Sequence, residues 1–383
     1  MALQAPSMTA SDAQSATYLL SLRDAVDAIL LDDSEIVNVL GINYDGAVDQ
    51  DKWEWDEDEL NPNTVKAAAA GGLSTGSTVL LLSASQVARI TAGTLIKDQL
   101  SGKYEVAQCT ARSGVSATIT RGYNSTSAET HAAAAVWDIV ANPRPQGMAG
   151  PKDESVARTR SYNFTQIFSK GVSLTGTAEA IKHNGIANED SYQVDKRLRE
   201  LMRELDSTVI KGIRSSTRSS STVYGTMGGL IDYVKHAASG NTNSTAETIS
   251  PSVVNAMNKQ IWDDGGMPDI LLVGGVQKQK ISLFDREYRR STMDSRRAGF
   301  EVVEFLTDLG NTLRVVVDRW MPVDCALVLD SSRIAIRPLV GRDFFIEQLA
   351  KTGDFTARQI VGEYTLEVRQ AAKAHAIHWN LKQ

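Results

Sequence analysis

The stretch EDSYQVDKRLRELMRELDSTVIKG, residues 189–212, decides the fold of this chain. Its apolar residues recur every three or four positions, which is the spacing of one face of an α-helix, while Lys, Arg, Asp and Glu crowd the other faces. The apolar stripe consists of Val194, Leu198, Leu201, Leu205 and Val209. We predict a helix about 35 Å long, with an N-cap at Asn188 and an end at Gly212. Such a rod is either an ordinary long surface helix or a part that packs among copies of itself.

The composition is that of an ordinary globular protein. The chain has 383 residues, of which 42% are hydrophobic and 22% are charged, so it is long enough for two or three domains and too apolar for a disordered chain. The formal net charge of -6 gives no sign of a dedicated nucleic-acid binder. This charge still allows a protein that surrounds nucleic acid without gripping it.

Neither the cysteines nor the hydropathy indicates a secreted or membrane protein. Cys109 and Cys325 lie far apart in sequence, which favours two reduced core residues over a disulfide framework or a metal site. The sequence lacks a run of about 18 apolar residues, so we expect no membrane span. Residues 1–16 lack the basic and apolar regions of a secretory signal and are typical of a flexible arm. Residues 16–31 are compatible with a helix.

Residues 73–140 differ in character from the rest of the chain. Short β-favouring runs alternate there with glycine-containing turns, a pattern that predicts a small β-barrel or sandwich. The predicted strands are Thr78–Leu82, Thr94–Lys97, Tyr104–Thr110, Ala117–Thr120 and Val136–Val140. Because the segments on either side belong together, we interpret this module as an insertion.

The second half of the chain predicts a mixture of helices and strands. Extended structure is expected at Ser161–Thr177, and a helix at Ser250–Asp264 with Ser250 as its cap and Pro251 in its first turn. Further elements are a buried strand at Ile270–Val273, a helix at Val276–Phe284, and strands at Val302–Leu306, Leu313–Asp318 and Cys325–Leu329. The tail alternates as two longer strands, Phe344–Ala350 and Arg358–Trp379, with a turn at residues 352–354.

No motif for catalysis or cofactor binding stands out. The glycine-rich segment Gly72–Thr78 lacks the lysine of a phosphate loop and precedes a strand instead of a helix. An acidic run over residues 49–59 lacks the spacing of a calcium loop, so we interpret it as a solvated or interfacial face. His375 and His378 lie at an odd offset within a predicted strand and therefore on opposite faces. We predict no catalytic, cofactor-binding or metal-binding residues.

A basic cluster after residue 284 is the best candidate for contact with a polyanion. It comprises Arg286, Arg289, Arg290, Arg296 and Arg297. Asp285, Glu287 and Asp294 interrupt the cluster and neutralise part of its charge, which is unusual for a DNA-binding stripe. Ion pairs between subunits are the favoured interpretation, because arginine binds carboxylates in a bidentate way.

Taken in order, several segments resemble a known family. They are KWEWDEDEL, the inserted module with TRGY and a following His131, YNFTQIF, GVSLTGTAEAI, the long helix, and LAKTGDFTARQIVGEYTLEV. This order is similar to that of tailed-bacteriophage major capsid proteins with the Hong Kong 97-like fold, and more narrowly to the branch whose extended loop carries a β-barrel. The resemblance covers nearly the whole chain from about Ala16.

The resemblance implies an α+β fold with the long helix as the spine of a peripheral domain. The implied parts are an N-terminal arm (1–31), the peripheral domain and extended loop (32–72 and 141–222) with its spine helix (189–212), the inserted β-barrel (73–140), an axial domain (223–338), and a return to the peripheral domain (339–383). Within this scheme, the arms order by lying across neighbouring subunits.

The resemblance also implies a function without enzymatic activity or cofactors. A protein of this kind self-assembles into hexamers and pentamers that form the icosahedral head shell of a tailed phage (Caudoviricetes). The shell encloses double-stranded DNA without sequence-specific binding or a membrane. Further expected partners are a portal and separate scaffolding or decoration proteins. The expected location is the virion, after assembly in the cytoplasm of the host bacterium.

Charged and aromatic residues outside the predicted core are the candidates for contacts between subunits. They are Trp53, Trp55, Asp56, Asp58, Arg199, Arg203, Arg289, Arg290, Arg296 and Arg297. Two other functions stay open at this point. One is another virion protein, from the tail tube or a decoration layer, and the other is a metal-dependent hydrolase that uses the carboxylates of residues 54–59.

Overall fold

The chain folds into two compact units. The computed structural model describes residues 34–68, 72–100, 102–147, 155, 157–181, 188–215, 224–237, 240–284, 289–291, 302–351 and 353–382. Unit 1 contains the described residues of Met1–Trp55 and Arg160–Gln383, and unit 2 those of Asp56–Thr159. The helix predicted at residues 16–31 lies outside the described residues.

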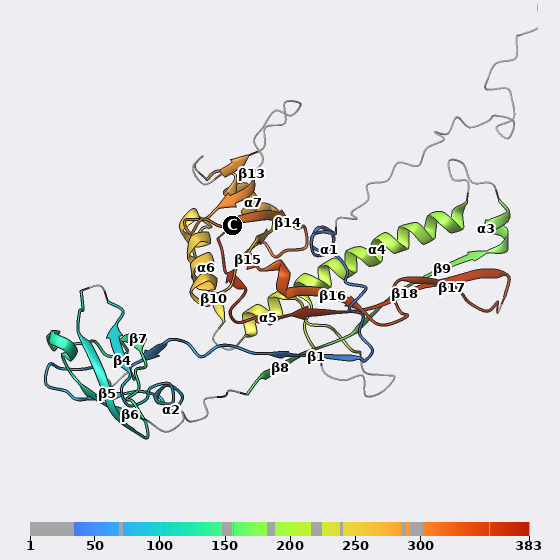
Figure 1. Cartoon of the computed structure of the whole chain (residues 1–383). Helices are drawn as coiled ribbons and strands as arrows, with labels where there is room; N and C mark the ends of the chain where they lie inside the picture. Colours follow the sequence, from blue (N-terminus) through green and yellow to red (C-terminus); the bar gives the residue numbers. More distant parts are fainter. Residues whose placement is uncertain are drawn as a thin grey trace, which may run out of the picture. The chain divides into compact units, whose positions relative to one another are not determined.

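A long helix, α4, packs on a four-stranded sheet in unit 1 (Figure 1). The strand order of this sheet is β16–β18–β17, and β9 pairs with β18 along its whole length. The elements are β9 (Gln166–Thr175), α3 (Gly176–Ala180), α4 (Glu189–Lys211), β16 (Ile334–Pro338), β17 (Phe345–Gln348) and β18 (Phe355–Val368). In β9 and β18 the segments YNFTQIF and GEYTLE meet as antiparallel partners, with Tyr364 opposite Gln166.

The ends and the buried face of α4 follow the sequence pattern. The side chain of Asn188 caps the helix by accepting a hydrogen bond from the backbone N–H of Ser191 at 3.3 Å. Leu201, Leu205 and Val209 are fully buried, as the spacing predicts. Gly212 ends the helix where a Cβ atom would lie 2.5 Å from the carbonyl oxygen of Met227, so no other residue fits there without a shift.

The second sheet of unit 1 has seven strands in the order β10–β19–β15–β11–β14–β13–β12. Its elements and the helices of this region are α5 (Leu230–His236), β10 (Asn241–Asn243), α6 (Pro251–Asp263), β11 (Ile270–Val273), α7 (Gly275–Ile281), β12 (Arg289–Ser291), β13 (Val302–Leu306), β14 (Thr312–Val317), β15 (Cys325–Leu329), a 3-10 turn (Ser331–Arg333) and β19 (Ala376–Trp379). Every residue of β11 and β15 is buried, because one face packs toward α4 and the other toward α6. This burial explains their continuous apolar sequences.

The prediction of one strand over residues 358–379 is wrong. The alternation continues across the segment, but the chain turns after Val368 and passes through Gln370 at a positive φ of 54°. β18 stays in the four-stranded sheet, whereas β19 pairs with β10 and β15 in the seven-stranded sheet. The sequence pattern also missed α1 (Glu35–Leu40), α5 and β16, which are short.

A two-stranded ribbon of β1 (Lys52–Glu57) and β8 (Thr159–Phe164) carries the chain between the two units. Unit 2 is a six-stranded sheet in the order β2–β7–β4–β5–β6–β3. Its elements are β2 (Thr64–Lys66), β3 (Val79–Leu81), α2 (Ala84–Val87), β4 (Leu95–Asp98), β5 (Val106–Ser113), β6 (Ser116–Thr120), a 3-10 turn (Tyr123–Ser125) and β7 (Val136–Ala141). This sheet begins before residue 73, because β2 pairs with β7.

A buried charge cluster holds the turns of unit 2 together. Glu105 is fully buried and forms two hydrogen bonds of 2.6 Å with Arg121, the arginine of the TRGY segment. His131 connects this pair to Asp98, with 2.9 Å from Nε2 to Glu105 Oε2 and 2.7 Å from Nδ1 to Asp98 Oδ2. The ring of His131 also packs on that of Trp137, with centroids 4.4 Å apart. The TRGY segment and His131 therefore serve one structural cluster.

The cluster makes the stability of unit 2 depend on pH. Burial alone would raise the pKa of Glu105, but hydrogen bonds from Arg121, the backbone of Glu129, His131 and the backbone of Gly122 bring it down to about 2. A carboxyl whose pKa is lower in the folded state stabilises the fold above its unfolded-state pKa of about 4.5. We expect this contribution to be lost as the pH falls from about 4.5 to about 2.

Replacing Glu105 tests this prediction. In Glu105→Gln, Arg121 stays buried without its counter-charge, and we expect a loss of about 3–5 kcal/mol at pH 7. The loss should shrink as the pH falls from about 4.5 to about 2, because over this range the wild type loses the stability that ionised Glu105 contributes. Hydrogen exchange of peptides from residues 105–121 measures both effects, with the exposed Glu59→Gln as control. A loss of stability in Glu105→Gln that does not change with pH would contradict the lowered pKa of Glu105.

Leu201 tests the packing of α4. Leu201→Asp buries an uncompensated charge in the core of unit 1 and should cost several kcal/mol, enough to prevent stable folding. Ser191→Asp places the same side chain on the exposed first turn of α4 and should leave the melting temperature nearly unchanged. Thermal melts followed by circular dichroism compare the two variants. Equal melting temperatures for Leu201→Asp and Ser191→Asp would show that the helix does not bury the face that carries Leu201.

Candidate assembly surface

Most charged residues of α4 pair within the chain. Asp190 lies 2.9 Å from Arg358 of β18, and Glu204 lies 3.1 Å from Lys170 of β9. These two ion pairs connect both halves of α4 to the sheet beneath it. Part of the mixed charge that suggested contact with neighbours therefore holds the helix to its own sheet.

The two predicted interface arginines of α4 differ in their surroundings. Arg199 is exposed and lies 3.1 Å from Asp195, one turn earlier, whose side chain is also exposed. Such a pair contributes about 0.3–0.5 kcal/mol. Arg203 is half-buried, and its guanidinium lies over the ring of Trp320, 5.8 Å from the centroid. Arg199 is therefore the more accessible of the two to a neighbouring subunit.

The structure places Trp53 and Trp55 against unit 1. Both belong to β1, in which alternate residues face opposite sides, and their side is the covered one. Trp53 donates from Nε1 to Glu367 at 2.7 Å, and Trp55 is only 7% exposed, with its ring 6.1 Å from that of Tyr233. Both tryptophans anchor the start of the ribbon, a role that the sequence did not predict.

Arg337 completes the anchor of Trp53. Its guanidinium lies 5.2 Å from the centre of the Trp53 ring, and its Nε donates to Glu367 at 2.6 Å. Its Nη1 also donates to the carbonyl of Gly46 at 2.7 Å. The carboxylate of Glu367 is nearly buried, and it gathers the tryptophan and the arginine at one point of β18.

The acidic run on β1 meets basic residues of β8. Glu54 pairs with Lys52 and, at 3.4 Å, with Arg160 across the ribbon, and the hydrogen bond from Lys52 is the main cause that lowers the pKa of Glu54. Asp58 lies 3.7 Å from Arg158, while Asp56 is exposed on the same side as Glu54. The predicted interface residues Asp56 and Asp58 thus belong to an exposed surface of mixed charge.

The basic cluster is only partly described. Arg289 and Arg290 belong to β12, at the edge of the seven-stranded sheet, where they pair with Phe305 and Glu304 of β13. Arg286, Arg296 and Arg297 lie outside the described residues. The assignment of these arginines to an interface stays a prediction.

Asn163 of the YNFTQIF segment is a buried junction that the sequence did not identify. Its Nδ2 donates to the carbonyls of Gly228 at 3.1 Å and Leu366 at 2.6 Å, and its Oδ1 accepts from the N–H of Gly228 at 2.9 Å. Next to it, Thr165 donates to the buried Glu363 at 2.6 Å. These bonds fix β8 to β18 and to the segment before α5, which explains why the motif mixes polar and aromatic residues.

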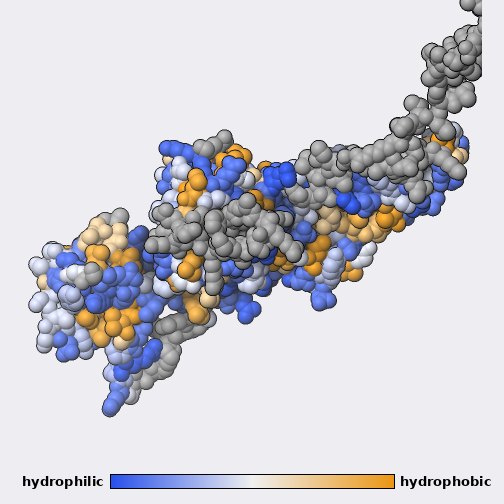
Figure 2. Space-filling view, turned by 90° about the horizontal axis from the view of Figure 1, so that it is seen from above, coloured by the Kyte–Doolittle hydropathy of each residue, from blue (hydrophilic) through white to orange (hydrophobic). Residues whose placement is uncertain are grey.

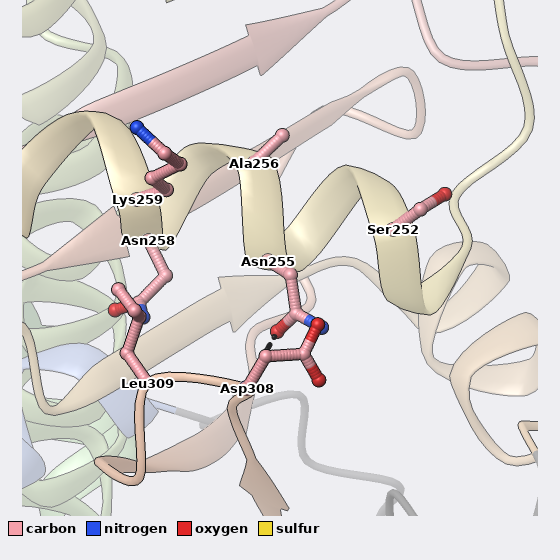
Figure 3. A pocket seen from close by; sticks show the side chains of 7 residues that line it. All are labelled: Ser252, Asn255, Ala256, Asn258, Lys259, Asp308 and Leu309. Atoms are coloured by element: carbon pink, nitrogen blue, oxygen red, sulfur yellow. Dashed lines mark hydrogen bonds between the residues drawn. The ribbon is translucent and has the colours of Figure 1, made fainter. Parts of the chain in front are cut away.

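A small pocket lies between α6 and the turn that joins β13 and β14 (Figure 3). Its volume is about 270 Å³. It is lined by Ser252, Asn255, Ala256, Asn258, Lys259, Asp308 and Leu309. The amide of Asp308 donates to Asn255 Oδ1 at 3.4 Å across one side, and Lys259 pairs with Asp263.

The described surface carries hydrophobic residues in both units. Figure 2 shows hydrophobic patches within a largely hydrophilic face. The exposed hydrophobic residues include Val79, Leu81, Tyr104, Val115 and Val140 in unit 2 and Trp262, Met267 and Val340 in unit 1, all more than one third exposed. Single exposed hydrophobic residues are normal on protein surfaces, so these residues alone do not mark an interface.

The described residues do not form a group of three or more potential metal ligands. His375 and His378 are both fully buried, but they have separate partners: His375 Nδ1 accepts from the amide of Asp330, and His378 Nε2 lies 2.8 Å from Glu247. Burial lowers the pKa of His375 to about 4. Among the described helices, none is long and apolar enough to span a membrane.

The fold as a whole is similar to that of a viral shell subunit. A chain of the cyanophage A-1(L) capsid asymmetric unit matches with a TM-score of 0.54 and 10% identity, over 97% of this chain and 99% of that chain. A chain from Microbacterium phage Oxtober96 matches with a TM-score of 0.44 and 16% identity, over 85% and 94% of the two chains. The mixed α+β fold is thus one that phage capsid subunits use.

The sequence comparisons give the family. The model of the SU10 major capsid protein matches residues 6–382, so the chain belongs to the SU10 major capsid protein family. The major capsid protein of Escherichia phage Phieco32 is 23% identical over 244 residues, which are 50% of this chain and 68% of that protein. The chain is a structural protein of the tailed-phage capsid and a component of the virion, and it is not an enzyme. The predicted family is confirmed, and the hydrolase hypothesis is wrong.

Replacing Trp53 tests whether its side chain stabilises the subunit itself or serves only contacts with other subunits. Trp53→Ala removes the ring under Arg337 and one donor to Glu367, so we expect the melting temperature of the unassembled subunit to fall by several degrees. Leu60→Ala, at a site that is 94% exposed, is the control and should change nothing. Unchanged stability of Trp53→Ala would mean that the ring serves only contacts with other subunits.

Proposed function

We propose that this capsid protein has the Hong Kong 97-like fold and assembles into hexamers and pentamers that form an icosahedral head shell around double-stranded DNA. The observation that carries the proposal is the likeness to a phage capsid subunit over 97% of this chain and 99% of that one. A likeness of this extent leaves little of either chain for a different architecture.

In the proposed arrangement α4 is the spine helix of the peripheral domain. The four-stranded sheet and the described parts of residues 32–72, 141–222 and 339–383 belong to this domain and to the extended loop, except β2, which pairs within unit 2, and β19, which pairs within the seven-stranded sheet. The seven-stranded sheet with α6 and α7 forms most of the axial domain, residues 223–338. The supporting observation is that α4 and both sheets share one hydrophobic core.

We propose that unit 2 is a small β-barrel inserted into the extended loop. Its two edge strands are β2 and β3, and the amide of Ala68, just after β2, donates to the carbonyl of Leu81 in β3 at 2.8 Å. A hydrogen bond between the two edges is what a closing sheet requires. The ribbon of β1 and β8 then represents the two arms of the loop.

Contacts between subunits involve the predicted interface residues that are exposed, above all Arg199, Asp56 and Asp58. Contacts within a hexamer or pentamer join two different surfaces head to tail, and such contacts close into rings. The further partners are a portal and separate scaffolding or decoration proteins, and assembly takes place in the cytoplasm of the host bacterium. The net charge of -6 suits a shell that encloses DNA without adhering to it.

A charge reversal on α4 tests the assembly surface. Arg199→Glu should fold with a melting temperature within a few degrees of the wild type, because its ion pair with Asp195 is exposed. Assembly should be impaired, as measured by sedimentation and negative-stain electron microscopy.

Arg199→Lys keeps the charge and is the matched control, which should assemble like the wild type. Equal assembly of Arg199→Glu would show that this face is merely solvated. A wild-type protein that stays monomeric at micromolar concentration under all salt conditions would instead overturn self-assembly itself.

A further inference from the structure

Two carboxyl groups meet inside unit 1, and neither forms an ion pair with a cationic side chain of the described residues. Asp206, on the buried face of α4, is 0% exposed, and Asp318, just after β14, is 1% exposed. The N–H of Val37 in α1 donates to Asp206 Oδ1 at 3.0 Å, and the N–H of Trp320 donates to Asp318 Oδ1 at 2.7 Å. Each carboxyl therefore has one oxygen held by the backbone.

The second oxygens, Oδ2 of Asp206 and Oδ2 of Asp318, are both buried and lack a donor from any other group. The two side chains nevertheless lie within hydrogen-bonding range of each other. Two ionised carboxylates only accept and repel each other, so the contact requires a proton on one of them. Burying two unpaired negative charges side by side is far more costly than burying one shared proton.

We propose that Asp206 and Asp318 share one proton and act as a pH-sensitive joint between α4 and the seven-stranded sheet. The joint connects α4, the end of β14 and the first turn of α1. It lies where these three elements pack on one another, within the core that both sheets of unit 1 share.

Within the part of the chain that the structure describes, Asp206 and Asp318 take part in no ion pair. The charged side chains closest in sequence on the three elements are Glu35 of α1, Arg203 of α4 and Arg319 beside Asp318. Arg203 is placed over the ring of Trp320, and the charged group with the largest effect on Asp206 is Asp318 itself. Apolar residues, among them Leu205 and Val209, fill the same core.

The direction of the pH effect follows from the chemistry. Burial, followed by the hydrogen bond to Asp318, raises the pKa of Asp206 to about 8, against the ordinary value of 3.8. The folded chain therefore keeps a proton that the unfolded chain loses, so the stability falls as the pH rises from about 4 to about 8 and then levels off. Below pH 4 the folded and the unfolded chain both hold the proton, so the stability no longer depends on this group.

The test compares the melting temperatures of unassembled subunits between pH 5 and pH 9. Asp206→Asn supplies a permanent N–H donor to Asp318 and removes the titration. The melting temperature of Asp206→Asn minus that of the wild type should therefore increase steadily up to about pH 8. Asp49→Asn, at an exposed site, is the control and should give a constant difference.

Asp318→Asn is the second variant, because it replaces the other partner of the same proton and should give the same dependence on pH. In the wild type, hydrogen exchange of peptides that contain Val37 and Trp320 should accelerate between about pH 4 and pH 8 by more than its intrinsic rate does, and only with the intrinsic rate above pH 8; this measurement needs no variant. Parallel melting curves for wild type and Asp206→Asn, or unchanged protection in the wild type, would overturn the proposal. A loss of wild-type stability on adding EDTA would also overturn it, since a metal ion would then occupy the place of the proton.

Discussion

The burial of one face of α4 is the constraint on which unit 1 depends. Leu201, Leu205 and Val209 lie in a single core with residues of both sheets. Each of these side chains stabilises the fold by about 1.5–3 kcal/mol through its burial. Among the described elements, neither sheet has another long helix in this core, so α4 supplies much of the apolar surface that both of them bury.

Because α4 must bury one face, its sequence carries a regular apolar pattern from which the helix could be predicted. An apolar stripe repeated over about four turns is a strong signal, and so are the capped helix α6 and the short apolar strand β11. Short elements with weak periodicity were missed, as in α1. In β1 the residues KWEWDE were interpreted as an acidic face, although their strict alternation of polar and aromatic residues is that of a half-covered strand.

The buried polar groups could not be predicted, because their partners are remote in sequence. Asn163 binds a carbonyl 203 positions away, Asp206 an amide 169 positions away, and Trp53 a carboxylate 314 positions away. A polar residue within an apolar segment shows only that it needs a partner. The fold decides which partner it meets, so the anchors of the ribbon and the carboxyl pair became visible only in three dimensions.

The charged residues of α4 form two groups, one paired with the sheet beneath the helix and one exposed on its outer side. Asp190 and Glu204 pair with the sheet and restrict the position of the helix, whereas Arg199 and Asp195 form an exposed pair that contributes little to folding. Exposed charges of this kind mainly influence the rate and the register of association. The pairs to the sheet fix the position of the helix, whereas the outer pair stabilises the helix by only about 0.3–0.5 kcal/mol. On the proposed assembly, α4 therefore divides its charges between two tasks: the pairs to the sheet hold the helix in place, and the exposed charges are left for contact with a neighbouring subunit.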